Sequence, residues 1–184
     1  MMVALWILLA VEVVARAVLE VREARLTQVK AGAFGVLRLI PLVNDIVPLP
    51  ESRKEPLVGN FVKFHEEAHG VYHHSVLRNL FKVAVLMLAV GLLAMLMGRY
   101  GLPLWAAILW LHVVAVPGRV LFHFYCWNQE YECDKYALEA TDKQVAKKAL
   151  RELASCEIPH TILFSLIYRE HPSAALRKKR LLGR

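Results

Sequence analysis

Two histidines and a glutamate in the first half of the chain have the types and spacing that metal chemistry needs. In the stretch HEEAHGVYHH, His65 and His69 lie four residues apart, and Glu66 follows the first of them. Residues four apart share one face of an α-helix, so both imidazoles can bind one zinc ion as two corners of a tetrahedron. The carboxylate of Glu66 can reach a water molecule held by that ion, as a general base must. The pattern predicts a zinc hydrolase site if a third protein ligand exists, because a catalytic zinc ion takes three ligands and one water.

A candidate for the third ligand lies in the stretch EYECD. Glu130 and Asp134 are four residues apart and share a helix face. Polar residues continue this face towards the N-terminus, at His112, Arg119 and His123. A polar stripe on an apolar helix should face a bundle interior, where Glu130 can bind the metal and Asp134 can accept the spare N–H of a ligand histidine. The alternative is that EYECD forms a solvated helix face.

Long apolar segments must position these residues. The chain has 184 residues, of which 57% are hydrophobic, and its apolar blocks alternate with basic ones, as is typical of membrane proteins. Three membrane spans are predicted, at residues 1–20, 83–98 and 102–127. The last two are joined by a short link and form a helical hairpin, which folds EYECD back beside the two histidines. Glu12 and Arg16 interrupt the first span but can pair on one face, and we read it as an anchor and not as a removed signal peptide.

The distribution of basic residues predicts the orientation of the hairpin. Of the 23 Lys and Arg residues, only Arg99 lies in the link between the two spans. Basic residues remain on the cytoplasmic side of a membrane, so residues 21–82 and 128–184 are expected in the cytoplasm. The sequence thus predicts an integral, multi-pass protein of the plasma (inner) membrane, with the active site facing the cytoplasm.

The expected fold is mainly α: a membrane-anchored helical bundle with a zinc-peptidase core and a small β element at about residues 33–50. Short runs of Val, Ile and Leu, broken by proline, predict one or two strands around residues 36–47, which could pair with an extended substrate. The predicted order is an N-terminal anchor (1–20), a cytoplasmic segment with short strands (21–64), the active-site helix running directly into the second span (65–82), the transmembrane hairpin (83–127) and a cytoplasmic helical part that completes the zinc site (128–184).

The net charge limits the classes of partner that are expected, and the spacing of the cysteines indicates the role of the thiols. The net charge of +7 is accompanied by no recognition motif, so no nucleic-acid partner is expected. The three cysteines, Cys126, Cys133 and Cys156, show no C-x-x-C spacing and are interpreted as reduced, structural thiols. The first two lie on one helix face, where core packing is favoured over metal binding. The oligomeric state stays open.

These motifs carry a family resemblance. H-E-x-x-H, then a hairpin, then E-[Y/F]-x-[small]-D resembles the membrane gluzincins, which include the HtpX-type heat-shock proteases and the CAAX prenyl proteases. The later HPSAALR matches a family stretch at His171 and Arg177, and His74 matches a CAAX histidine. The resemblance covers roughly residues 60–182 and implies a minimal family member. It implies zinc held by His65, His69 and Glu130, Glu66 as base, Asp134 beside a ligand histidine, His171 at the oxyanion, and structural or substrate support from Arg177.

The chain departs from the family at several points. Glu67 stands where the family has an apolar residue, and Cys133 where alanine is common. Three spans cannot enclose the large chamber of the seven-span CAAX proteases, so prenyl-substrate processing is not expected. His74 would lie about 140° around a continuous helix from His69 and is not expected to be a ligand. His73 is assigned to packing or to the cavity lining.

Three functional hypotheses remain. The first is a zinc-dependent endopeptidase of the membrane that acts on peptides or membrane proteins near the bilayer. The second is a non-catalytic membrane scaffold or sensor that is clamped by a metal. In this hypothesis Glu66 has no function. The third keeps the metal site but hydrolyses a bond other than a peptide bond.

Overall fold

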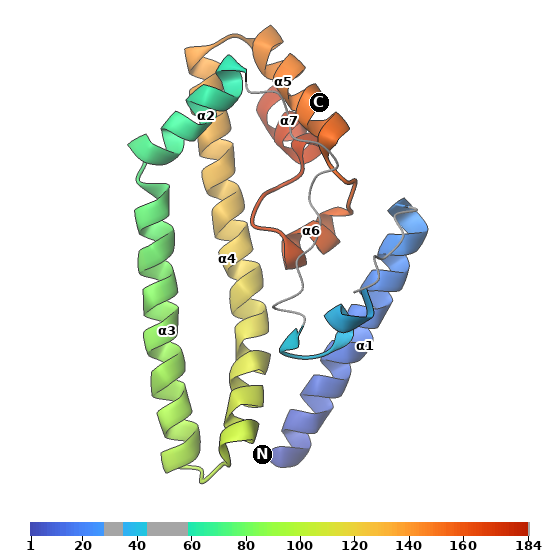
Figure 1. The fold of residues 1–184 in the computed structure, drawn as a ribbon, viewed down its shortest axis with the longest axis vertical. Coiled ribbons are helices and arrows are strands. Elements are labelled where there is room, and N and C mark those ends of the chain that lie inside the picture. The colour runs from blue at the N-terminus through green and yellow to red at the C-terminus, as the bar shows by residue number, and fades with distance from the viewer. Residues whose placement is uncertain (28–34, 44–58, 184) are drawn as a thin grey trace. The chain divides into compact units, whose positions relative to one another are not determined.

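Helices make up almost all of the computed structural model, which describes residues 1–27, 35–43 and 59–183 (Figure 1). The described elements are α1 (Met2–Thr27), the 3₁₀-helix η1 (Gly35–Leu39), α2 (Asn60–Val71), α3 (His74–Gly98), α4 (Leu104–Ala140), α5 (Lys143–Cys156), α6 (Ile162–Tyr168) and α7 (Ala174–Leu182). The mainly α fold predicted from the sequence is confirmed, and no sheet occurs among these residues.

The predicted β element is wrong wherever the structure describes it. Gly35–Leu39 is a 3₁₀-helix, and Leu42 has a φ of 70°, which ends any extended run. Arg38 of η1 donates to both carboxylate oxygens of Glu20 on α1, at 2.7 and 3.1 Å. This bidentate ion pair ties the turn to α1, and such tertiary contacts override a weak strand propensity. The rest of the predicted element, residues 33–34 and 44–50, lies outside the described residues.

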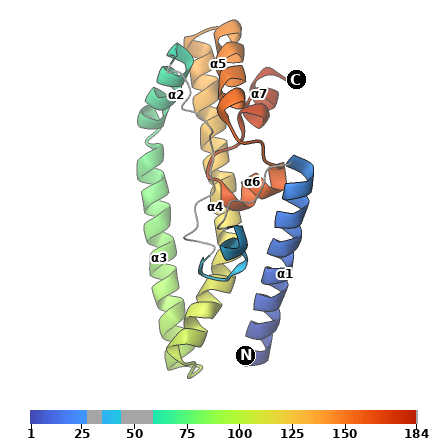
Figure 2. The same ribbon diagram turned by 45° about the vertical axis from the view of Figure 1, so that its right-hand side comes forward.

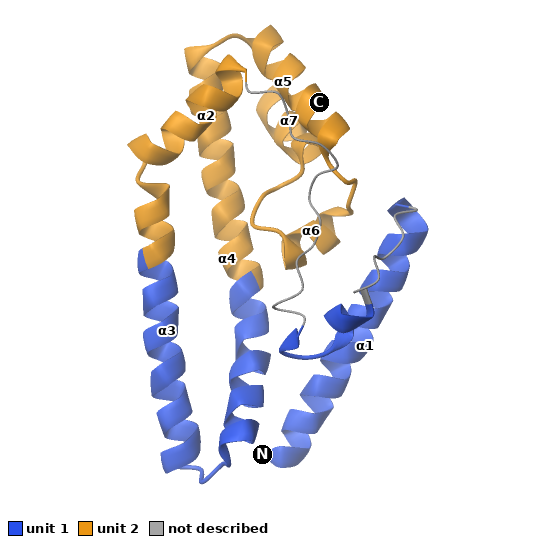
Figure 3. Ribbon diagram, in the orientation of Figure 1, with its two compact units in different colours: residues 1–48, 80–119 blue, residues 49–79, 120–184 orange. Residues whose placement is uncertain are grey.

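The chain divides into two compact units, each described by itself (Figure 3). Unit 1 comprises residues 1–48 and 80–119, and unit 2 comprises residues 49–79 and 120–184. In unit 1, Leu5 and Leu9 of α1 pack with Ala106 of α4. Nearby, Glu12 accepts hydrogen bonds from Arg16, at 2.8 Å, and from His112, at 2.9 Å. The predicted pairing of Glu12 with Arg16 is therefore confirmed.

Three described helices, α1, α3 and α4, are long and apolar enough to cross a membrane. In both views of the ribbon, the short link at residues 99–103 joins one end of α3 to one end of α4, and the direction of the chain reverses there (Figures 1 and 2). Their large apolar side chains are exposed over long stretches, as at Leu86, Met87 and Leu88. Since water disfavours such a surface, these helices are suited to lipid.

Unit 2 has its own small core, which joins helices distant in sequence. Phe61 of α2, Ala137 of α4, and Ala146 and Leu150 of α5 are completely buried together. Helix α5 begins after the N-cap residue Asp142, whose side chain accepts from the backbone N–H groups of Gln144 and Val145. This core fixes α2 against the second half of α4, where the predicted third ligand lies.

The sequence predicted that the active-site helix runs directly into the second span, and this prediction is wrong. Helix α2 ends at Val71, His73 adopts a φ of 53°, and α3 begins at His74. A left-handed residue redirects the chain because it breaks the helical repeat. The first turn of α3 therefore approaches the site from a direction that would be impossible if α2 and α3 formed one continuous helix.

Candidate metal centre

Helices α2 and α4 bring the three predicted metal ligands together in unit 2. His65 Nε2 lies 3.2 Å from Glu130 Oε2, and His69 Nε2 lies 3.4 Å from Glu130 Oε1. One ligand atom from each residue lies within 4.8 Å of the other two. Donors at about 2.0–2.1 Å from a tetrahedral zinc ion are about 3.3–3.4 Å apart, so the donor set fits such an ion. The predicted third ligand is distant in sequence from the two histidines, and α3 and α4 return the chain to them.

Asp134 and Arg177 hold the ring of His65 from behind. His65 Nδ1 lies 3.0 Å from Asp134 Oδ1, which leaves Nε2 directed at Glu130. Arg177 of α7 donates from Nε to Asp134 Oδ2 at 2.9 Å and from Nη2 to Oδ1 at 2.6 Å. A carboxylate that accepts the spare N–H of a ligand histidine fixes the ring's orientation and tautomer. Asp134 is positioned for this task, and Arg177 orients Asp134.

The two histidines differ in their electrostatic environment. Burial disfavours the charged ring of His65, but hydrogen bonds to Asp134 and Glu130 outweigh it and raise the pKa of His65 above its ordinary value of 6.5. Burial lowers the pKa of His69 below the same value. A ring nitrogen surrounded by carboxylate oxygens attracts a cation, either a proton or a metal ion. The site is thus electrostatically suited to a divalent ion at the Nε2 atoms.

A further cation at the site, Arg78, was missed by the sequence analysis. Arg78 lies one turn after the start of α3 and donates from Nη2 to Glu130 Oε1 at 3.0 Å and from Nε to Gln129 Oε1 at 2.6 Å. No motif marks it, and its position one turn after His74 is meaningful only once the break between α2 and α3 is known. The guanidinium compensates the buried negative charge of Glu130.

His171 reaches the site from the loop between α6 and α7. Its Nδ1 lies 3.1 Å from Glu130 Oε1, and its side chain is 48% exposed. The loop is held at both ends: Trp127 Nε1 donates to the carbonyl oxygen of Arg169 at 3.1 Å, and the backbone N–H of Ala174 donates to Glu157 at 2.9 Å. His171 is therefore a fixed neighbour of the metal ligands with one face open to solvent.

Glu66 faces the same cavity as the three ligands. The cavity has a volume of about 380 Å³, and Glu66, His65, His69, Glu130 and His171 all line it. Glu66 itself is exposed. The adjacent Glu67 points elsewhere and accepts a hydrogen bond from the Tyr136 hydroxyl at 3.3 Å. The cavity thus combines a donor set that can bind an ion with one accessible carboxylate, that of Glu66. Among the described interactions, this carboxylate makes no contact with Arg78 or Arg177.

His74 lies against His69, contrary to the sequence analysis. His74 Nδ1 is 3.1 Å from His69 Nδ1 and 3.4 Å from Cys133 Sγ. The expected separation of about 140° assumed a continuous helix, and the left-handed His73 invalidates it. His73 was assigned to packing or to the cavity lining, but it is exposed and is not among the residues that line the cavity of about 380 Å³.

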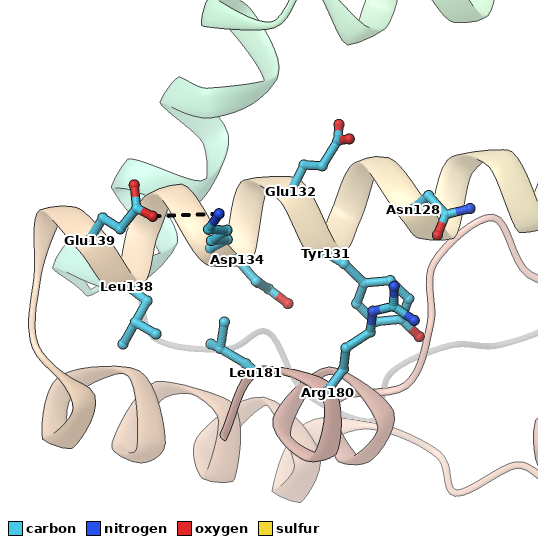
Figure 4. A pocket seen from close by; sticks show the side chains of 9 residues that line it. Asn128, Tyr131, Glu132, Asp134, Leu138, Glu139, Arg180 and Leu181 are labelled. Carbon is cyan, nitrogen blue, oxygen red and sulfur yellow. Dashed lines mark ion pairs between the residues drawn. The ribbon is translucent and has the colours of Figure 1, made fainter. Parts of the chain in front are cut away.

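A second hollow of about 600 Å³ lies between α4 and α7, and Asp134 is one of the residues that line it (Figure 4). Arg180 of α7 stacks 4.6 Å above the ring of Tyr131, and Leu138 and Leu181 project into the same space. A cation–π contact of this kind stabilises the docking of one helix on another. It helps to keep α7, and with it Arg177, against Asp134.

Comparison with known proteins identifies the family. The model of Peptidase family M48 matches residues 59–184, which is more than half of the chain and includes the whole of the metal centre. No curated protein and no solved structure matches the chain. The three apolar helices, together with this match, make the chain a membrane protein. The chain belongs to Peptidase family M48 and is a metallopeptidase of the HtpX and CAAX protease kind, in a minimal form.

Proposed function

We propose that the chain is a zinc-dependent, HtpX-like endopeptidase of the membrane, with its active site at the cytoplasmic face. One observation carries the proposal: His65 Nε2, His69 Nε2 and the Glu130 carboxylate converge on a cavity that Glu66 also lines. Two nitrogen donors, one oxygen donor and an open side are the ligand set of a catalytic zinc ion. A metal that served only as a clamp would be expected to have four protein ligands.

The residues of the cavity divide the reaction between them. His65, His69 and Glu130 would hold a zinc ion, which would supply a Lewis acid for acidifying a water molecule and polarising the scissile carbonyl. Glu66 accepts the proton of the attacking water and delivers it to the leaving amine. His171 donates an N–H to the oxygen on which negative charge develops. Arg78 and Arg177 fix Glu130 and Asp134 in place through charge-assisted hydrogen bonds.

Removal of the metal by a chelator tests both zinc binding and the cleavage of peptide bonds. We expect the purified full-length protein in detergent to hold zinc and to cleave casein, to lose cleavage when a chelator removes the metal, and to regain it when zinc is returned. Metal analysis and peptide release are measured on the same samples. Zinc binding without cleavage of casein or of membrane-protein substrates would favour the scaffold hypothesis, or hydrolysis of another bond.

Asp134→Asn should weaken metal binding without removing a ligand. The amide cannot accept from His65 and from Arg177 as the carboxylate does, so the ring loses its fixed orientation. Loss of such an outer partner typically costs about 10–100-fold in metal affinity. Competition with a chelator of known affinity measures the change. Asn128, which lies on the same helix and donates to the backbone of Phe124, offers a control as Asn128→Ala. Equal metal affinity of wild type and Asp134→Asn would contradict the role of Asp134.

The length of α4 supports a site beyond the lipid. This helix has 37 residues and measures about 55 Å, whereas the hydrocarbon core is about 30 Å thick. If the span begins at Leu104, Glu130 lies past its far end, on the side opposite to Arg99.

Thiol labelling tests this orientation. With Cys156 replaced by serine, we expect Tyr100→Cys to react with a membrane-impermeant thiol reagent on intact cells, and Lys148→Cys to react only after permeabilisation. Both positions are exposed, and the other two cysteines are buried. The opposite labelling pattern would reverse the proposed orientation.

A further inference from the structure

A second cluster of metal-binding side chains lies on the other side of the His69 ring. One potential ligand atom from each of His69, His74 and Cys133 lies within 4.8 Å of the other two. The two ring nitrogens are 3.1 Å apart, and the thiol sulfur lies 3.4 Å from that of His74. His74 and Cys133 are both buried. Neither residue is needed by the reaction proposed above.

The two separations from His74 Nδ1, 3.1 and 3.4 Å, are slightly shorter than those between ligands around one ion. For a tetrahedral ion with bonds of about 2.0 Å to nitrogen and about 2.3 Å to sulfur, adjacent ligand atoms are about 3.3–3.6 Å apart. In the contact between the two Nδ1 atoms, one ring must carry the proton that both nitrogens share. A cation at the centre of the cluster would take the place of that proton and of the thiol proton, so two protons would leave as one divalent ion enters.

We infer that His69, His74 and Cys133 form a second, inhibitory site for a soft, thiophilic divalent cation. A thiolate and two imidazoles select zinc or cadmium over magnesium or calcium, which prefer oxygen ligands. The inhibitory effect rests on the proposed function, because it acts through His69. A neutral imidazole binds a metal through one nitrogen only, so an ion at Nδ1 draws His69 away from its role as a ligand through Nε2.

The cluster has an exposed edge through which an ion can enter. Glu132 of α4 lies beside His74, with its Oε2 atom 3.4 Å from His74 Nε2. Its side chain is 65% exposed. Its carboxylate attracts cations to this edge. Cys133 is also the position at which the chain departs from the alanine common in the family it resembles, so the site is a property of this chain's own sequence.

Cadmium serves as the probe because its bond to a thiolate has a charge-transfer band in the ultraviolet. The zinc-loaded, full-length protein in detergent is titrated with cadmium while this band and casein cleavage are followed. We expect the band to saturate with one cadmium ion per chain and activity to fall at least about tenfold in parallel, the scale on which disturbed histidine orientation acts. Cys133→Ala should lose the band, and its activity, normalised to its own rate without cadmium, should resist the same cadmium concentration.

Cys126→Ala is the matched control, because Cys126 is a completely buried thiol on the same helix. It should retain both the band and the inhibition. Absence of the band from the wild type, or its persistence in Cys133→Ala, would overturn the second site. Equal inhibition of wild type and Cys133→Ala would place the effect at the catalytic ligands and would overturn the inhibitory role. A band that depends on Cys133 in a protein without any peptidase activity would support the second site and refute the proposed function.

Discussion

Glu66→Gln should abolish peptide hydrolysis while the protein keeps its metal. The amide has nearly the shape of the carboxylate but cannot accept a proton from water, so the general base is lost and the ligand set is untouched. General acid–base catalysis contributes roughly 10²–10⁴-fold to a rate, and kcat should fall by about that factor. The measurements are casein cleavage at saturating substrate and metal content by elemental analysis.

Glu67→Gln is the matched control for this variant. Glu67 carries the same side chain one residue further along α2, but it faces Tyr136 and not the cavity. The substitution makes the same change in net charge, so a non-specific charge effect would appear in both variants. We expect Glu67→Gln to cleave at the rate of the wild type. Undiminished proteolysis by Glu66→Gln would remove Glu66 from its role as the base.

The sequence predicts the pairwise geometry of the site well because helical spacing is local. His65 and His69 share a face of α2, and Glu130 and Asp134 share a face of α4, as a period of 3.6 residues requires. That the two faces meet depends on the buried core around Phe61, which no motif encodes. The apolar segments predicted all three long helices, since runs of this length have few alternatives.

The errors concern backbone conformations that the sequence does not encode locally. Nothing in VYHH marks His73 as left-handed, and this single φ brings both His74 and Arg78 to the site. Val and Leu in the GVLRL stretch favour a strand by composition, but the ion pair from Arg38 to Glu20, 18 residues away, stabilises a 3₁₀ turn. The 3₁₀ turn thus depends on a contact between residues distant in sequence.

Glu130 is the central residue of the candidate metal centre, since it contacts four cationic or ring side chains at once. His65, His69, Arg78 and His171 all lie within 3.4 Å of its carboxylate oxygens. Its removal should therefore change metal binding and local stability together. A test must separate these effects, because a variant that only unfolds would say nothing about ligation.

Glu130→Gln should lose at least about 100-fold in zinc affinity, because even outer-shell partners of a ligand change affinity by about 10–100-fold and Glu130 is proposed as a direct ligand. Cleavage should fall below detection at zinc concentrations that saturate the wild type. Thermal unfolding with and without chelator separates ligation from folding: the wild type should lose stability on chelation, since bound zinc stabilises the folded state, and the variant should show no such difference. Glu139→Gln, an exposed position on the same helix paired with Lys135, is the control and should behave as the wild type. If Glu130→Gln bound zinc with unchanged affinity, Glu130 would not be the third ligand, and the two histidines would need another acid to complete a peptidase site.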